Sequence, residues 1–258
     1  MACCFNHSMK MFAVRGTIRK KGAKSNEQRL GDLQSKSWNA DSEVTVCKNV
    51  STFHFIISRC NFRRQRDDVT AIVFGDTEID GSSPNRQEVS FRRAVAHPDY
   101  FVLTQNDIVI LELESPVTLT DYVRPVCLSG IKNELEAYDN CWLAAWGKIN
   151  ALNENSQFLQ EAPSGVRSDD ECRAELESYG ITYHQTTLCG RIRPEVETHV
   201  CRGDAAAAMM CYGEDARWHL VGQLSGVAGE CGDTHSFFNR VSYLRDYINE
   251  TINRIEGM

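Results

Sequence analysis

Hydrophobic residues along this chain fall mainly in short runs separated by turn-forming residues. Residues 69–74 form one such run, which Gly75 and Asp76 end, and residues 108–113 form another, which Ser115 and Pro116 follow. Similar runs occupy residues 44–46, 53–57, 141–146 and 219–224. Many short strands with turn signals between them predict an all-β fold, arranged as a sandwich or a barrel.

The C-terminal segment has a different period. Its apolar residues recur at steps of three and four, at Val241, Leu244, Ile248, Ile252 and Ile255. This spacing places them on one face of an amphipathic helix. We expect the helix to pack onto the body of the domain.

Residues 1–42 are polar and basic, and they show no sustained period of either kind. We interpret them as a poorly ordered lead segment. A basic arm for an acidic partner is the alternative interpretation.

The bulk composition is that of an ordinary globular protein. The chain has 258 residues, 42% hydrophobic and 24% charged, which suffices for one large domain or two small domains sharing an interface. The net charge of −7 gives no reason to expect nucleic acid as a partner. The sequence has no apolar run long enough to span a membrane.

Eleven cysteines are many for a cytosolic protein of this size, and they indicate a secreted or extracellular protein with disulfides. Reduced cysteines scattered through the core are the alternative. N-x-S/T sequons occur at Asn6, Asn49 and Asn249, and we expect glycosylation at Asn49 and Asn249.

No signal peptide is visible at the start of the sequence. The apolar stretch at residues 9–14 is too short and contains Lys10. The start is therefore either internal to a longer precursor or an alternative transcript start, and both explanations stay open.

The stretch 201–211 reads C-R-G-D-A-A-A-A-M-M-C. It resembles the active-site loop of the chymotrypsin/trypsin family of serine proteases, C-x-G-D-S-G-G-P-x-x-C. Both cysteines, Gly203 and Asp204 keep the family spacing. The nucleophilic serine falls on Ala205, and alanines at 206–208 replace Gly-Gly-Pro. An alanine methyl group cannot attack a carbonyl carbon.

Other blocks resemble the same family and occur in its order. They are H-P-D-Y at 97–100, N-D-I-V-I-L at 106–111, R-P-V-C-L at 124–128, C-W-L-A-A-W-G at 141–147 and L-C-G at 188–190. The resemblance covers residues 43–253. It implies two packed six-stranded antiparallel β-barrels with a C-terminal α-helix. The trypsin-like domain would then span 43–258, with barrels at about 43–125 and, including the helix, about 135–255.

The family resemblance also implies which cysteines pair. The implied disulfides are Cys47–Cys60, Cys141–Cys211, Cys172–Cys189 and Cys201–Cys231. Cys127 stands where many relatives link the protease domain to an upstream segment, so that Cys3 or Cys4 is its expected mate.

The catalytic triad of the family is not intact in this sequence. The base histidine of T-A-A-H-C falls on Arg59 in I-I-S-R-C, and the acid falls on Asp107. Arginine stays protonated in proteins and cannot act as a general base. We hypothesise that Arg59 instead forms an inert salt bridge with Asp107. In the alternative, Asp107 keeps local hydrogen bonds, including one from Ser225, and Arg59 faces solvent.

The substrate pocket implied by the resemblance is altered. Its base, an aspartate in trypsin, falls on His199, and the S-W-G strand that pairs with substrate begins at Ser225. Two pocket-wall glycines fall on Val227 and Ser236. We expect a narrowed or filled pocket, although drift of surface loops would leave the same pattern.

The activation sequence of the family is also missing, because no I-V-G-G precedes Cys47 at the required distance. In relatives, the ammonium group released by cleavage pairs with the aspartate before the nucleophile. Asp204 occupies that position, and we expect it to find another partner.

These features predict a pseudoprotease that acts as a binding or regulatory protein through a protein partner, by analogy with inactive members of the family. An active serine endopeptidase with a displaced site is the alternative. A purely structural role, or no role, is a third possibility. We expect no cofactor and no metal.

Overall fold

The computed structural model describes residues 71–78, 82–101, 105–130, 140–146, 156–193, 196, 200–201, 204–205, 207–228 and 235–257, and the backbone of residues 54–57. The lead segment 1–42 and the predicted strand at 44–46 lie outside these ranges.

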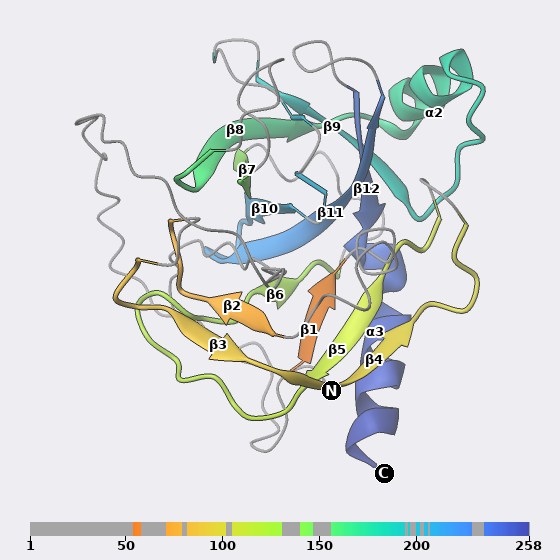
Figure 1. Ribbon diagram of the computed structural model, residues 1–258. Coiled ribbons are helices and arrows are strands. Elements are labelled where there is room, and N and C mark those ends of the chain that lie inside the picture. The colour runs from red at the N-terminus through yellow and green to blue at the C-terminus, as the bar shows by residue number, and fades with distance from the viewer. Residues whose placement is uncertain are drawn as a thin grey trace, which may run out of the picture.

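The strands of the N-terminal half form two small antiparallel sheets (Figure 1). One has the order β1 (His54–Ile57), β5 (Val109–Leu113) and β4 (Phe91–Ala96), and the other pairs β2 (Ile72–Phe74) with β3 (Gln87–Val89). The two sheets enclose a common apolar core, to which β2 contributes Ile72 and Phe74 and β5 contributes Val109 and Leu111. These strands are consistent with the first of the two expected barrels.

The strands of the C-terminal half close into a ring. Its neighbours in order are β7 (Asn140–Ala145), β8 (Gln160–Val166), β9 (Thr187–Ile192), β12 (His235–Arg240), β11 (Trp218–Ala228) and β10 (Ala208–Tyr212). Strand β10 pairs with both β11 and β7, which closes a six-stranded antiparallel barrel. The short strand β6 (Cys127–Leu128) pairs with β11 in parallel. The predicted all-β fold and its second barrel are therefore confirmed.

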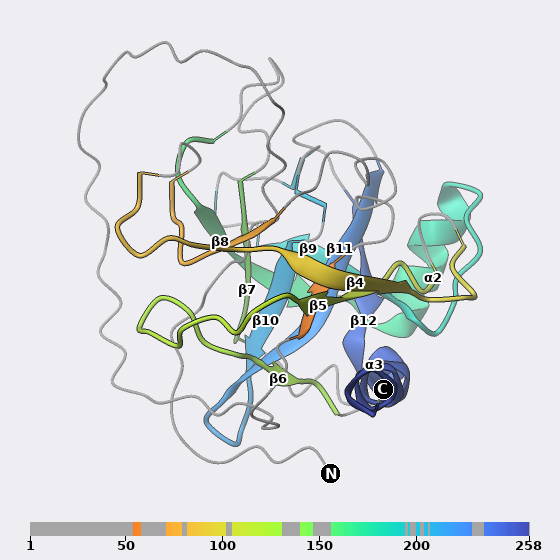
Figure 2. The same cartoon turned by 60° about the horizontal axis from the view of Figure 1, so that its bottom comes forward.

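The C-terminal helix is confirmed as α3 (Val241–Glu256), and it contacts both halves (Figures 1 and 2). Its buried Val241, Leu244 and Ile248 belong to one apolar cluster with Ile108 and Ile110 of the first half. Met210 of β10 and Leu220 of β11 join the same cluster. Burial of this apolar surface holds the two halves and the helix together. Because the hydrophobic effect is non-directional, it does not by itself fix how the two halves are oriented to each other.

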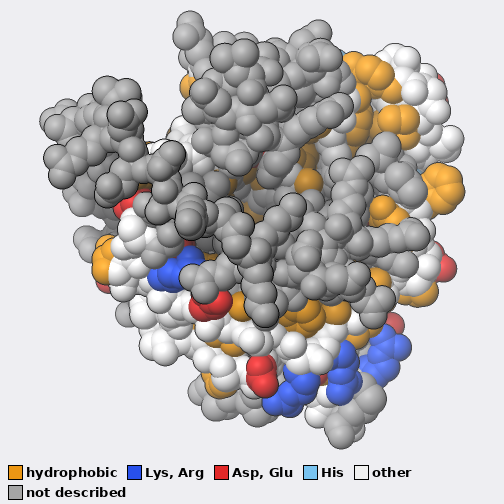
Figure 3. Space-filling view, in the orientation of Figure 1, with side chains coloured by type: hydrophobic (Ala, Val, Ile, Leu, Met, Phe, Trp, Pro, Cys, Tyr) orange, Lys and Arg blue, Asp and Glu red, His pale blue; other side chains and the backbone are white. Residues whose placement is uncertain are grey.

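A buried glutamate interrupts the apolar pattern of β5. Glu112 is 4% exposed, and two arginines of the neighbouring edge strand β4 reach its carboxylate. Arg92 Nη1 and Arg93 Nε lie 3.6 and 3.4 Å from its oxygens. Figure 3 shows Lys and Arg side chains gathered over β4. Charged side chains on an edge strand discourage pairing with a further strand.

A second helix, α2 (Asp169–Ser178), was not expected from the sequence. It begins with a capping box in which Ser168 and Glu171 exchange hydrogen bonds with each other's backbone. Only Cys172 and Leu176 are buried along it, so the sequence shows few apolar residues at helical spacing. Both residues pack against the outer face of the second barrel, beside Cys189 and Phe237.

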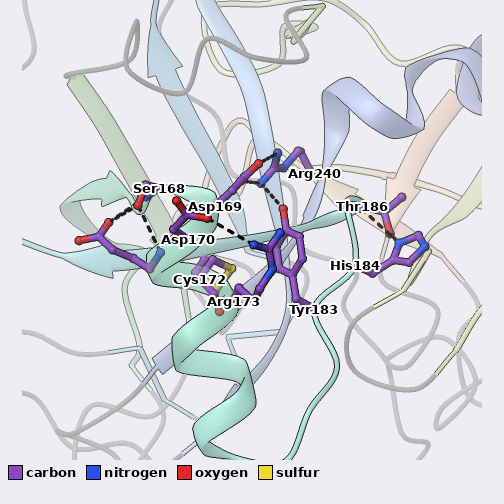
Figure 4. Close-up of polar contacts among 11 residues, drawn as sticks. Ser168, Asp169, Asp170, Cys172, Arg173, Tyr183, His184, Thr186 and Arg240 are labelled. Atoms are coloured by element: carbon purple, nitrogen blue, oxygen red, sulfur yellow. Dashed lines mark hydrogen bonds and ion pairs between the residues drawn. A yellow bond between two sulfur atoms is a disulfide. The ribbon is translucent and has the colours of Figure 1, made fainter.

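Arg240 joins the beginnings of the two helices (Figure 4). The residue is 1% exposed and occupies the N-cap position of α3. Its guanidinium donates two hydrogen bonds to the carboxylate of Asp169 in the first turn of α2. Partial burial acts to raise the pKa of Asp169, but the hydrogen bonds and charge of Arg240 outweigh it. The pKa of Asp169 therefore lies below its ordinary value.

We predict that Asp169→Asn lowers the free energy of unfolding, because it leaves the buried guanidinium of Arg240 without its carboxylate. Because Asp169 is half-exposed, we expect the free energy of unfolding to fall by about 1–3 kcal/mol, which is less than for a fully buried ion pair. A carboxyl with a depressed folded pKa stabilises above its unfolded pKa, and the contribution disappears as pH falls through the folded pKa. Denaturant unfolding from neutral pH to about pH 2 should therefore show the difference between wild type and variant shrinking with acid.

Asp170→Asn provides the matched control, because Asp170 is the next residue of the same turn and its side chain is 94% exposed beside Arg173. The control should stay within about 0.5 kcal/mol of wild type. Equal losses in both variants would contradict the role assigned to Arg240 and Asp169.

Candidate functional site

Asp107, the expected acid position, lies in a turn two residues before the start of β5. Asn106 adopts a left-handed conformation with φ 54°, which asparagine tolerates better than most residues. Its side-chain Nδ2 donates to the carbonyl of Asp99 at 3.0 Å, and the Ile108 N–H donates to the carbonyl of Asn106 at 2.8 Å. Asp107, which follows Asn106 in this turn, is 0% exposed.

Two strands of the second barrel supply hydrogen bonds to Asp107. Ser225 Oγ, on β11, donates to the Oδ2 of Asp107 at 2.6 Å. Asn239, on β12, accepts from the Asp107 N–H at 2.9 Å through Oδ1 and donates to the Asp107 carbonyl at 2.6 Å through Nδ2. Both partners are almost completely buried. Asp107 is thus a point at which the two halves of the molecule are bonded to each other.

The hydrogen bond from Ser225 agrees with the alternative interpretation for Asp107. Arg59 lies outside the described residues, so the salt bridge to Asp107 stays a prediction. The sequence did not identify Asn239, although an amide directly after the apolar pair Phe237 and Phe238 is a signal that could have drawn attention to it.

The loop that carries Ala205 is closed by hydrogen bonds from its own backbone. The Cys201 N–H donates to the Oδ2 of Asp204 at 2.8 Å, and the Ala207 N–H donates to the Asp204 carbonyl at 2.8 Å. The Leu224 N–H donates to the Ala207 carbonyl at 2.8 Å, which attaches the loop to β11. The partner expected for Asp204 therefore includes the backbone of its own loop.

The two expected pocket-wall positions face each other. Val227 of β11 and Ser236 of β12 are direct cross-strand partners. Val227 packs against the apolar core of the second barrel, and Ser236 is 2% exposed. His199, at the expected base of the pocket, lies outside the described residues.

Two of the expected disulfides are present, Cys141–Cys211 and Cys172–Cys189. The first joins neighbouring strands β7 and β10, and the second ties α2 to β9. Cys201 is also disulfide-bonded, but its expected partner Cys231 lies outside the described ranges, as do Cys47 and Cys60.

The remaining expected modification and linkage sites are placed only in part. Cys127 is buried in β6, while Cys3 and Cys4 lie outside the described residues. Asn249 lies on α3 and is half-buried, and Asn49 is outside the described part of the chain. A link through Cys127 and glycosylation at Asn49 and Asn249 stay predictions.

Neither a membrane-spanning helix nor a metal-binding cluster occurs within the described residues. No helix there is both long and apolar enough to cross a bilayer. The same residues contain no group of three or more His, Cys, Asp or Glu side chains suited to a metal ion.

A comparison with protein families agrees with this architecture. The family model described as Trypsin matches residues 60–248, which is well over half of the chain. The match includes the turn with Asp107, the loop with Ala205 and both strands that bond to Asp107.

We predict that Ser225→Ala lowers the free energy of unfolding by about 1–3 kcal/mol, because a buried carboxyl oxygen of Asp107 loses a donor. Denaturant unfolding measures the change. Ser90→Ala, at an exposed position, should stay within about 0.5 kcal/mol of wild type. Indistinguishable stabilities for the two variants would show that the Ser225 bond is not made in solution.

Proposed function

The chain belongs to the trypsin family, and on this premise we propose that it is a pseudoprotease, a protein that binds a protein partner without cleaving it. The observation that carries the proposal is Ala205, which stands where the family loop has its nucleophilic serine. The methyl group of alanine has no lone pair with which to form an acyl-enzyme.

The expected base position supports the same conclusion. By the sequence resemblance, Arg59 falls on the histidine that takes the proton from the serine, and a guanidinium keeps its proton at every pH that a folded protein tolerates. In subtilisin, which carries the same triad on an unrelated fold, loss of the nucleophile alone costs about 10⁶ in turnover. This corresponds to about 8 kcal/mol of transition-state stabilisation.

The binding surface that we propose is the overhanging end of β11. Strand β11 pairs with β10 only as far as Gln223. Its last residues, up to Ala228, pair with β12 on the other edge. In the family, the corresponding segment pairs with the backbone of the substrate. An extended segment of a partner protein can add to such an edge through main-chain hydrogen bonds. Val227, in place of a pocket glycine, excludes the long basic side chains that trypsin accepts.

An extracellular location is part of the proposal. The disulfides Cys141–Cys211 and Cys172–Cys189 support this location. Disulfides form in oxidising compartments, whereas the cytosol keeps cysteines reduced. The sequons at Asn49 and Asn249 are consistent with passage through a secretory pathway.

We predict that a fluorophosphonate probe labels neither the purified protein nor its Ala205→Ser variant. The wild type lacks the nucleophile, and the variant lacks the base that would activate the restored hydroxyl. In-gel fluorescence measures labelling, with trypsin as the positive control. Labelling of wild type would contradict the proposal, and labelling of the variant alone would show that another base serves the site.

We also predict that peptides selected from a random displayed library bind the edge of β11. Val227→Glu should weaken their binding by roughly tenfold or more, because a charged side chain on the edge of β11 disfavours pairing with a further strand. Thermal unfolding must show that the variant is folded, because Val227 also packs against the barrel core. Tyr212→Ser, at an exposed position on β10, is the control and should leave the Kd unchanged. Equal effects of the two substitutions, or a library that yields no binder, would contradict peptide recognition at this edge.

A further inference from the structure

The peptide groups of Asp107 lie outside the ladders of the sheet. Strand β5 begins at Val109, and the turn at Asn106 separates Asp107 from the preceding segment. A buried N–H and a buried carbonyl each require a hydrogen-bond partner, because water cannot reach them. The partners of the Asp107 N–H and carbonyl must therefore come from outside these ladders.

The carboxamide of Asn239 meets this requirement in the way that a neighbouring strand would. It accepts from the Asp107 N–H and donates to the Asp107 carbonyl, although the two residues are 132 positions apart. Asparagine is one of the side chains that offers an acceptor and a donor side by side. Ser225 adds a third bond, to the carboxyl group of the same residue.

Asn239 is itself held firmly. Its strand β12 lies between β11 and β9, and Asn239 is the cross-strand partner of Gln223 on one side and Thr187 on the other. The amide therefore projects from a strand that is paired along both of its edges. A rigid donor and acceptor pair fixes the position of Asp107 with a precision that apolar contact does not provide.

We propose that Asn239 and Ser225 form a latch on Asp107 that couples the two halves of the molecule into one cooperative unit. The apolar cluster around α3 supplies non-directional attraction between the halves, and the latch sets their register. Opening the halves would leave the N–H, carbonyl and carboxyl of Asp107 without these partners. This inference does not depend on whether the protein is a protease, because it concerns the backbone and carboxyl of Asp107 alone.

The tryptophans permit a direct test. The described tryptophans, Trp142, Trp146 and Trp218, all belong to the second half, and Trp38 can be replaced by phenylalanine in every variant. Tryptophan fluorescence then follows the second barrel, whereas far-UV circular dichroism follows strands of both halves. In the parent protein we expect the two denaturation curves to coincide.

Asn239→Leu should separate the two curves, and the Asp107 amide should exchange with deuterium roughly tenfold faster or more. Leu143→Ala is the control, because Leu143 lies in the core of the second barrel and contributes nothing to the latch. Both curves should shift together in the control. Coincident curves in Asn239→Leu, or separate curves in Leu143→Ala, would overturn the proposal.

A measurement on the unsubstituted protein covers the case in which Asn239→Leu does not fold. Native-state hydrogen exchange should give the Asp107 amide the same opening free energy as the amides of β5 and β12, because all three would exchange through unfolding of both halves. An Asp107 amide that exchanges through a smaller local opening would overturn the latch.

Discussion

A buried carboxyl residue at the junction between the two halves constrains the rest of the structure. Asp107 is 0% exposed, and both its peptide group and its carboxylate are hydrogen-bonded to side chains of the second half. Ser225 and Asn239 supply them from two adjacent strands of the barrel. The closed ring of β7 to β12, the helix that follows it and the apolar cluster beneath that helix all position these two side chains.

The loop around residue 205 is held by bonds that do not involve its side chain. The Cys201 N–H donates to the Asp204 carboxylate, and the Ala207 N–H donates to the Asp204 carbonyl. The Leu224 N–H donates to the Ala207 carbonyl, which attaches the loop to β11. A loop held in this way tolerates alanine at its centre. Such a frame is compatible with the proposal that the family fold persists without the family reaction, and that binding is the remaining role.

Local patterns in the sequence predict the elements that depend on neighbouring residues, and the family resemblance adds distant pairs such as Cys141–Cys211. Distant contacts outside the reach of both were missed. The strands at 72–74 and 109–113 follow from contiguous apolar runs, and the helix α3 follows from apolar residues at steps of three and four. The helix α2 was missed because Cys172 and Leu176 are its only buried residues. Its capping box, formed by Ser168 and Glu171, is a sequence signal for its start. The partner of Asn239 is 132 residues away, so that no local pattern identifies the pair. The same holds for Arg240 and Asp169, which are 71 residues apart.

The trypsin-family fold of this chain is proposed to carry no peptidase activity, and cleavage of peptides tests this most directly. The purified protein can be incubated with a complex mixture of peptides, and new termini can be identified by mass spectrometry. The proposed pseudoprotease yields the same termini as a mixture incubated without it. A set of new termini that share a residue preference, and that grow in proportion to the amount of protein, would contradict the account.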